Sequence, residues 1–156
     1  MTAFANWLAA TSASVWIASH DWVIPTVQSI HIVAIGVALV SAFMIGFRVL
    51  GWAGSDQTPA ETMDRYWPWL FGALGVLLVT GALMVLGEPA RELLAFSFWL
   101  KMCLVVIGTV MTWWAGRHQA KALTLVTLVV WIGIIFLGRL IAYDHIWGSW
   151  SGSTKA

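Results

Sequence analysis

The sequence predicts an all-α fold, an antiparallel four-helix transmembrane bundle with a short N-terminal interfacial helix. Hydrophobic residues make up 60% of the chain and charged residues only 10%, whereas soluble domains contain about 25% charged residues. Four apolar segments are long enough to cross a bilayer core of about 30 Å, which takes about 20 helical residues. The 12 tryptophans lie mostly near the segment ends, where membrane proteins place aromatic rings.

The chain is expected to form one integral membrane domain over residues 1–156, with spans at about 22–50, 66–86, 96–116 and 122–143. Before the first span, Phe4, Trp7, Leu8 and Val15 share one helical face within residues 4–18, which predicts the interfacial helix. Asp21 is the expected N-cap of the first span.

Two proline-containing motifs predict further helix starts. The residues Thr58, Pro59 and Glu61 have the spacing of a capping box with proline at the first helical position. The second helix is therefore expected to begin near Pro59, well before it enters the membrane. Pro89 is expected to begin a short helix that ends at about Leu94.

The charge distribution predicts an orientation. The first 47 residues contain no Lys or Arg, whereas Arg48, Arg65, Arg117 and Lys121 all follow the first or third span. The positive-inside rule then places these four residues in the cytoplasm of a bacterial inner membrane, with both termini in the periplasm. The absence of early basic residues also argues against a signal peptide.

Several function classes are excluded by composition. The net charge of +1 and the lack of a basic run give no indication of nucleic-acid binding. Cys103 is the only cysteine, so an internal disulfide and a CxxC metal site are both excluded. No nucleophile with a neighbouring base, phosphate-binding loop or carboxylate pair is recognisable, which argues against hydrolase and phosphotransferase activity.

Three ionisable residues interrupt the spans: His31, Lys101 and Arg139. Ionisable residues within membrane spans are costly and mark functional sites. Alternating spans would place all three in the outer half of the membrane, with His31 about 13 Å beyond Trp22 at 1.5 Å per residue. Lys101 and Arg139 could instead extend their charged ends to the membrane surface, and His31 could be a neutral core residue bonded to Gln28 or to a backbone carbonyl.

This convergence predicts a haem b site. A neutral imidazole can ligate haem iron, so His31 is the expected axial ligand, while Lys101 and Arg139 would face the propionates or an anionic substrate. Met84, Met102 or Lys101 could supply a second axial ligand, and Gln28 and Tyr143 complete the expected cofactor-binding set. His20 and His145, at the outer membrane surface, form a weaker candidate site for copper or zinc.

Six short motifs are distributed along the chain, and the resemblance that they carry extends over nearly its whole length: QSIHIVAIG (28–36), FRVLG (47–51), TGALM (80–84), EPAR (88–91), FWLKM (98–102) and GRLIAY (138–143). Together they resemble a family of small bacterial four-span membrane proteins of unknown function. More distantly, a histidine on the first span and a lysine at the start of the third are similar to HemJ-type protoporphyrinogen oxidases and CopD-type copper-resistance domains. The HemJ resemblance implies haem b in a four-helix bundle, with His31 as iron ligand and Lys101 as a site residue. Because the chain lacks the arginine-rich start of HemJ proteins, the resemblance does not imply their oxidase activity.

The function expected from the sequence is that of a haem-b-binding membrane redox or electron-transfer protein. Its expected partners are the lipid bilayer, a quinone or redox proteins, and other membrane subunits or a second copy of the chain. Two alternatives remain open at this point. One is an accessory or assembly subunit of a larger membrane complex. The other is a transporter of a metal or small anion that uses His20, His145, Met84 and Cys103.

Overall fold

The computed structural model describes the backbone of residues 2–142 and the side chains of residues 2–138. Every regular element in that part of the chain is a helix: α1 (Thr2–Ala9), α2 (Ser12–Ala18), α3 (Val23–Leu50), α4 (Pro59–Gly87), α5 (Pro89–Leu94), α6 (Phe96–His118) and α7 (Lys121–Ala142). Four of these helices, α3, α4, α6 and α7, are long and apolar enough to cross a membrane. The predicted all-helical class is confirmed, as is the prediction of four long apolar helices.

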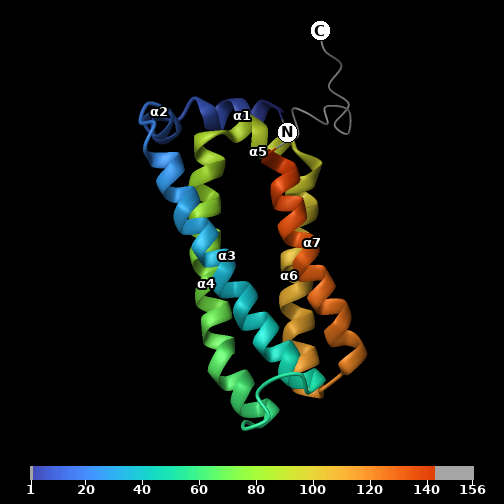
Figure 1. Ribbon diagram of the computed structural model, residues 1–156. Helices are drawn as coiled ribbons and strands as arrows, with labels where there is room; N and C mark the ends of the chain where they lie inside the picture. The colour runs from blue at the N-terminus through green and yellow to red at the C-terminus, as the bar shows by residue number, and fades with distance from the viewer. Residues whose placement is uncertain (1, 143–156) are drawn as a thin grey trace.

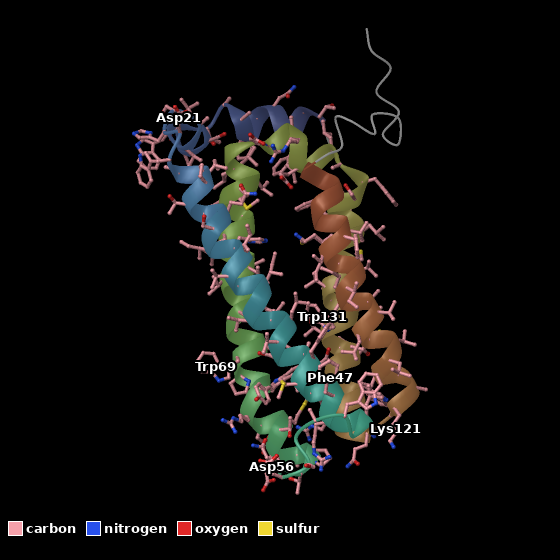
Figure 2. The ribbon with its side chains drawn as sticks, viewed as in Figure 1. Asp21, Phe47, Asp56, Trp69, Lys121 and Trp131 are labelled. Carbon is pink, nitrogen blue, oxygen red and sulfur yellow. The ribbon has the colours of Figure 1, made fainter. Side chains whose placement is uncertain are left out.

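The long helices form two pairs (Figure 1), α3 with α4 and α6 with α7. One end of the molecule carries α1, α2 and α5, and is called the α5 end below. The opposite end, called the loop end, carries residues 51–58 and the turn between α6 and α7. The ribbons of the two pairs lie closer together toward the loop end than toward the α5 end. In Figure 2, Asp21 lies at the α5 end, and Asp56 and Lys121 lie at the loop end.

The start of α4 follows directly from its sequence. Thr58 and Glu61 form the predicted capping box, since the Glu61 carboxylate accepts from the Thr58 N–H at 2.7 Å and the Thr58 hydroxyl accepts from the Glu61 N–H at 3.2 Å. Pro59 occupies the first turn, where the missing N–H does least harm. At the other end of the same loop, α3 ends at Gly51, whose φ of +79° is left-handed and favours glycine.

The predicted N-cap of α3 is wrong. The cap is Trp22, which makes no side-chain capping bond, and not Asp21. The reason is the turn that leads out of α2, in which the Val23 N–H donates to the His20 carbonyl at 3.0 Å. This turn uses the backbone donor that a capping carboxylate would otherwise bond, and it leaves Asp21 one residue before the cap.

The N-terminal segment forms two short helices rather than the single interfacial helix expected over residues 4–18. The helix is interrupted between α1 and α2 because Thr11 caps α2 with its side chain, which accepts from the Ser14 N–H at 3.4 Å. The Ser14 hydroxyl donates to the Leu86 carbonyl of α4 at 2.6 Å, which ties α2 to the end of that helix. Phe4, Trp7 and Val15 remain exposed, as expected for an apolar face turned away from the protein.

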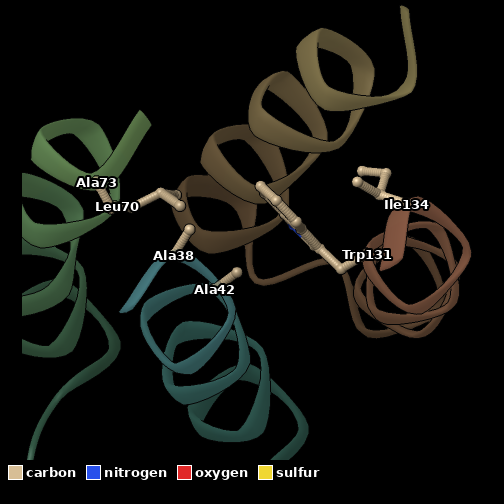
Figure 3. Close-up of a cluster of buried hydrophobic side chains, with 6 residues drawn as sticks. All are labelled: Ala38, Ala42, Leu70, Ala73, Trp131 and Ile134. Atoms are coloured by element: carbon tan, nitrogen blue, oxygen red, sulfur yellow. The ribbon is translucent and has the colours of Figure 1, made fainter. Parts of the chain in front are cut away.

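The core lies where the two helix pairs meet. Figure 3 shows Leu70 of α4 and Trp131 of α7 approaching the small residues Ala38 and Ala42 of α3 from opposite sides. Small residues let membrane helices approach closely, which is needed because burial from lipid supplies no hydrophobic driving force between them. Trp131 is 3% exposed, in contrast to Trp69, which points away from the other helices (Figure 2) and is 65% exposed.

Candidate functional site

His31 lies on α3 and faces α4. Its side chain is half-buried, and its Nδ1 lies 2.7 Å from the hydroxyl oxygen of Thr80 on α4. Thr80 is itself buried. The imidazole is therefore held between two helices by a side-chain hydrogen bond, and its partner is neither Gln28 nor a backbone carbonyl. The two partners expected for a neutral core histidine are therefore wrong, whereas the neutral core histidine itself agrees with this hydrogen bond.

Gly81, the residue after Thr80, leaves space beside the imidazole. A Cβ atom at position 81 would lie 3.7 Å from the His31 Cε1 atom, which is ordinary van der Waals contact. Any larger side chain at this position would cover the edge of the ring. The pair Thr80–Gly81 thus holds one ring nitrogen and leaves the neighbouring edge of the imidazole open.

Lys101 lies on the inward face of α6, together with Gly108 and Thr112. Its Nζ atom would be 3.7 Å from a Cβ atom at Gly138 of α7, so the ammonium group extends toward α7. Lys101 is close enough to His31 for their charges to interact. Among residues 2–138, no hydrogen bond or ion pair engages the Lys101 ammonium group. A partly buried cation without a protein partner is suited to an anionic ligand.

A second charged group lies at the α5 end. Glu92 of α5 is buried and accepts from Arg91 at 3.3 Å. Arg91 also pairs with the exposed Glu88 at 2.5 Å. The helix of Glu92, α5, contacts α6, which carries Lys101, but Glu92 and Lys101 do not form an ion pair.

Sequence reasoning did not identify Thr80 or Glu92. The sequence does contain a signal for Thr80, namely that Thr80 and His31 lie at similar distances from the α5 end of their helices. Thr80 is seven residues from the end of α4, or about 10 Å at 1.5 Å per residue, and His31 is eight residues from the start of α3, or about 12 Å. Both ends lie on the α5 side, so the two residues are at similar depth. The sequence carries no comparable signal for Glu92, whose burial depends on packing between α1, α5 and α6.

Three other expected site residues lie within the described part of the chain and make no hydrogen bond with His31. Gln28 is exposed and makes no hydrogen bond with His31. Met84 packs against the apolar cluster of Ile17, Val23 and Val27, and Met102 is 37% exposed on α6. The expectation that either methionine faces His31 as a second axial ligand finds no support in these positions.

Three expected site residues lie outside the described part of the chain. The backbone of Arg139 belongs to α7, but its side chain is not described, and Tyr143 and His145 lie beyond residue 142. His20 is described, and its Nδ1 lies 2.8 Å from the Trp16 carbonyl while its ring packs against that of Trp16 with the ring centres 4.4 Å apart. Within the described residues, no group of three or more His, Cys, Asp or Glu side chains could hold a metal ion. Cys103 is exposed there.

The residues around His31 fit a haem group in part. One imidazole is fixed in position by a hydrogen bond, as is common for metal-ligating histidines, and Lys101, which is unpaired within the described part of the chain, lies within electrostatic range. The described residues supply no evident second axial ligand. The chain matches no family model, no curated protein and no solved structure, so these contacts must carry any argument about function.

Proposed function

We propose that the protein is a haem-b-binding redox protein of a bacterial inner membrane. Its four long helices would form an antiparallel transmembrane bundle with both termini in the periplasm, as the distribution of Arg and Lys favours. The observation that carries the proposal is the His31 imidazole held by Thr80 at 2.7 Å, with the charge of Lys101, which has no ion-pair partner among residues 2–138, close enough to act on it.

The proposed roles follow from the chemistry of each side chain. His31 would be the axial ligand, because neutral imidazole is a common iron ligand in proteins. Lys101 and Arg139 would offset the negative charge of the propionates, and Gly81 would leave room for the macrocycle beside the imidazole. When bound, haem supplies one-electron redox chemistry, and the surrounding protein sets its potential through ligation, hydrogen bonds and burial. The resemblance to HemJ-type bundles supports the same assignment.

The test is a visible absorption spectrum of the purified protein before and after reduction with dithionite, with haem content measured after extraction. We expect a Soret band and haem bound in a fixed ratio to protein. His31→Ala should remove the haem, whereas the matched control His118→Ala should retain it. His118 is exposed at the loop end of α6 and packs against Trp114 with the ring centres 4.3 Å apart. A colourless wild-type protein from haem-replete cells would rule the proposal out.

A second candidate is a quinone-binding site. The specific observation in its favour is that His31 and Lys101 lie within electrostatic range of each other, at a depth accessible to a lipid-soluble ligand. Quinone carbonyl oxygens accept hydrogen bonds, so this function requires the two side chains to act as donors. The direction of the hydrogen bond between His31 and Thr80 therefore distinguishes the two functions.

A further inference from the structure

The hydroxyl of Thr80 points into the backbone of its own helix, where the Leu77 carbonyl oxygen at 3.4 Å is the more distant of two acceptors. The Thr80 Oγ1 lies 2.7 Å from the Val76 carbonyl oxygen, one helical turn earlier. A carbonyl oxygen can accept but never donate, so the hydroxyl must donate to it. The same bond to the carbonyl four residues earlier is made by other hydroxyl residues within the long helices: Ser41, Thr109, Thr112, Thr124 and Thr127.

Thr80 therefore presents only lone pairs to His31. The His31 Nδ1 and the Thr80 Oγ1 are 2.7 Å apart, a distance that requires a hydrogen between them. With the Thr80 hydrogen engaged by Val76, this hydrogen must come from Nδ1. A neutral imidazole carries one N–H, so its Nε2 is unprotonated. We infer that Thr80 is a positioning residue that fixes neutral His31 as the Nδ1–H tautomer and makes Nε2 an electron-pair donor.

This arrangement determines the chemical class of ligand that His31 accepts. No hydrogen bond engages Nε2 within the described residues, and Gly81 leaves the adjacent ring edge uncovered. Nε2 can bond to a metal ion or accept a hydrogen bond, but it cannot donate to a quinone carbonyl. The choice of haem iron as the metal rests on the proposed function, whereas the tautomer does not.

The tautomer can be measured without haem. Nitrogen-15 NMR of labelled histidine distinguishes a protonated from an unprotonated ring nitrogen, in the full-length chain in lipid nanodiscs at pH 8, prepared from haem-deficient cells. The signals of His31 are identified by their loss in His31→Gln. We expect the wild-type protein and Thr80→Ser to show Nδ1–H. Thr80→Val should shift the tautomer ratio roughly fivefold toward Nε2–H, because one hydrogen bond is worth about that factor.

Thr109→Val is the matched control. Thr109 makes the same bond, to the Val105 carbonyl at 2.7 Å on α6, but contacts no histidine among the described residues. The Thr109→Val substitution should leave the tautomer of His31 unchanged. An Nε2–H tautomer in the wild-type protein, or an unchanged ratio in folded Thr80→Val, would overturn the inference. Circular dichroism establishes folding, and Thr80→Ser provides the conservative rescue.

Haem binding is measured separately, so the two proposals fail separately. If haem is bound, Thr80→Val should weaken its binding roughly tenfold, since removing the outer partner of a ligating histidine typically costs 10- to 100-fold. Thr80→Ser should restore it. If the wild-type protein binds no haem but shows Nδ1–H, only the haem proposal falls. If haem depends on His31 while Thr80→Val leaves the tautomer unchanged, only the role of Thr80 falls.

Discussion

The regions around Trp131 and His31 use hydroxyl side chains in different ways. In the Trp131 region, defined here as Ala38, Ala42, Gly46, Thr112 and Trp131, the Thr112 hydroxyl donates to the Gly108 carbonyl at 2.7 Å and accepts from the Trp131 indole at 3.0 Å. In the His31 region, defined as His31, Thr80, Gly81, Lys101 and Gly138, the Thr80 hydroxyl makes the equivalent pair of bonds with a backbone carbonyl and His31.

The difference lies in what surrounds each hydrogen-bonded ring. Trp131 is almost completely buried and has no further polar atom to satisfy. His31 is half-buried, retains a second ring nitrogen, and has a lysine cation in electrostatic range. The first arrangement leaves no polar ring atom without a partner, whereas in the second the His31 Nε2 makes no hydrogen bond within the described residues. A buried hydroxyl–ring hydrogen bond therefore does not by itself indicate a functional site.

Packing around glycines shows the same contrast. A Cβ atom at Gly46 would come within 3.0 Å of Leu128, and one at Gly116 within 2.7 Å of Met63. At Gly81 and Gly138 the nearest atoms would be 3.7 Å away. Close contact between α3 and α7 therefore depends on glycine at position 46, whereas a Cβ atom at either glycine of the His31 region would make only ordinary van der Waals contact. The cavity next to Gly46 has a volume of about 10 Å³, which is at the lower limit of what one water molecule needs.

The largest expected effect on stability is that of Trp131→Ala. Removing a fully buried aromatic side chain should lower the free energy of unfolding by about 3–5 kcal/mol. His31→Ala, in the other region, should change it by less than about 1 kcal/mol because His31 is only half-buried. Unfolding in mixed detergent micelles, followed by circular dichroism, measures both. Equal losses in the two variants would remove the proposed distinction between the regions.

Gly46→Leu should have the next largest effect. A side chain at position 46 meets Leu128 and Thr124 on α7, and overpacking of this kind typically costs about 1–3 kcal/mol. Gly36→Leu is the matched control on the same helix, because a Cβ atom there meets nothing within 4 Å. The same unfolding assay applies. If Gly46→Leu were as stable as Gly36→Leu, α3 and α7 would not be in close contact at this point.

Thr112→Val tests the hydrogen bond in the Trp131 region. The substitution conserves shape but leaves the buried Trp131 N–H without an acceptor, which should cost about 1–3 kcal/mol. Thr80→Val should cost less, because the half-buried His31 can bond to water or to another group. Thr112→Ser should recover most of the stability. A larger loss for Thr80→Val than for Thr112→Val would contradict the comparison.

Lys101→Met should have the smallest effect on stability. It removes a partly buried cation that has no protein partner among the described residues, so the unfolding free energy should be unchanged or raised by up to about 1 kcal/mol. Haem content should fall in the same variant if Lys101 binds a propionate. Lys121→Met, at the exposed start of α7, is the control for loss of a charge. A marked loss of stability in Lys101→Met alone would indicate a structural role for the lysine.

Local sequence signals predicted the helices well. The capping box of Thr58 and Glu61 and the proline at position 89 act within one helical turn, so the sequence is sufficient to locate them. Asp21 had the right side chain for a cap, but the turn from α2 places the helix start one residue later. That turn depends on how α2 packs against α4 and α3, which no local pattern in the sequence shows.

The site was predicted less completely. His31 and Lys101 stand out in the sequence because a charge in an apolar span is rare and costly. Met84 and Met102 were candidates only because they lie near His31 in depth along the spans. The structure places Met84 against an apolar cluster and Met102 at an exposed surface. Thr80 does not stand out, since threonine within a span satisfies its own hydroxyl through the backbone.

The sequence by itself determined that the protein is helical, that four helices are long and apolar enough to cross a membrane, and which ionisable residues lie within them. These features follow from composition and from contacts within one helical turn. Only the tertiary structure decided that the Thr80 hydroxyl faces His31, that Lys101 points toward α7, and that Trp131 fills the contact between the helix pairs. These facts depend on the rotation and separation of neighbouring helices, which are set by packing between residues far apart in the chain.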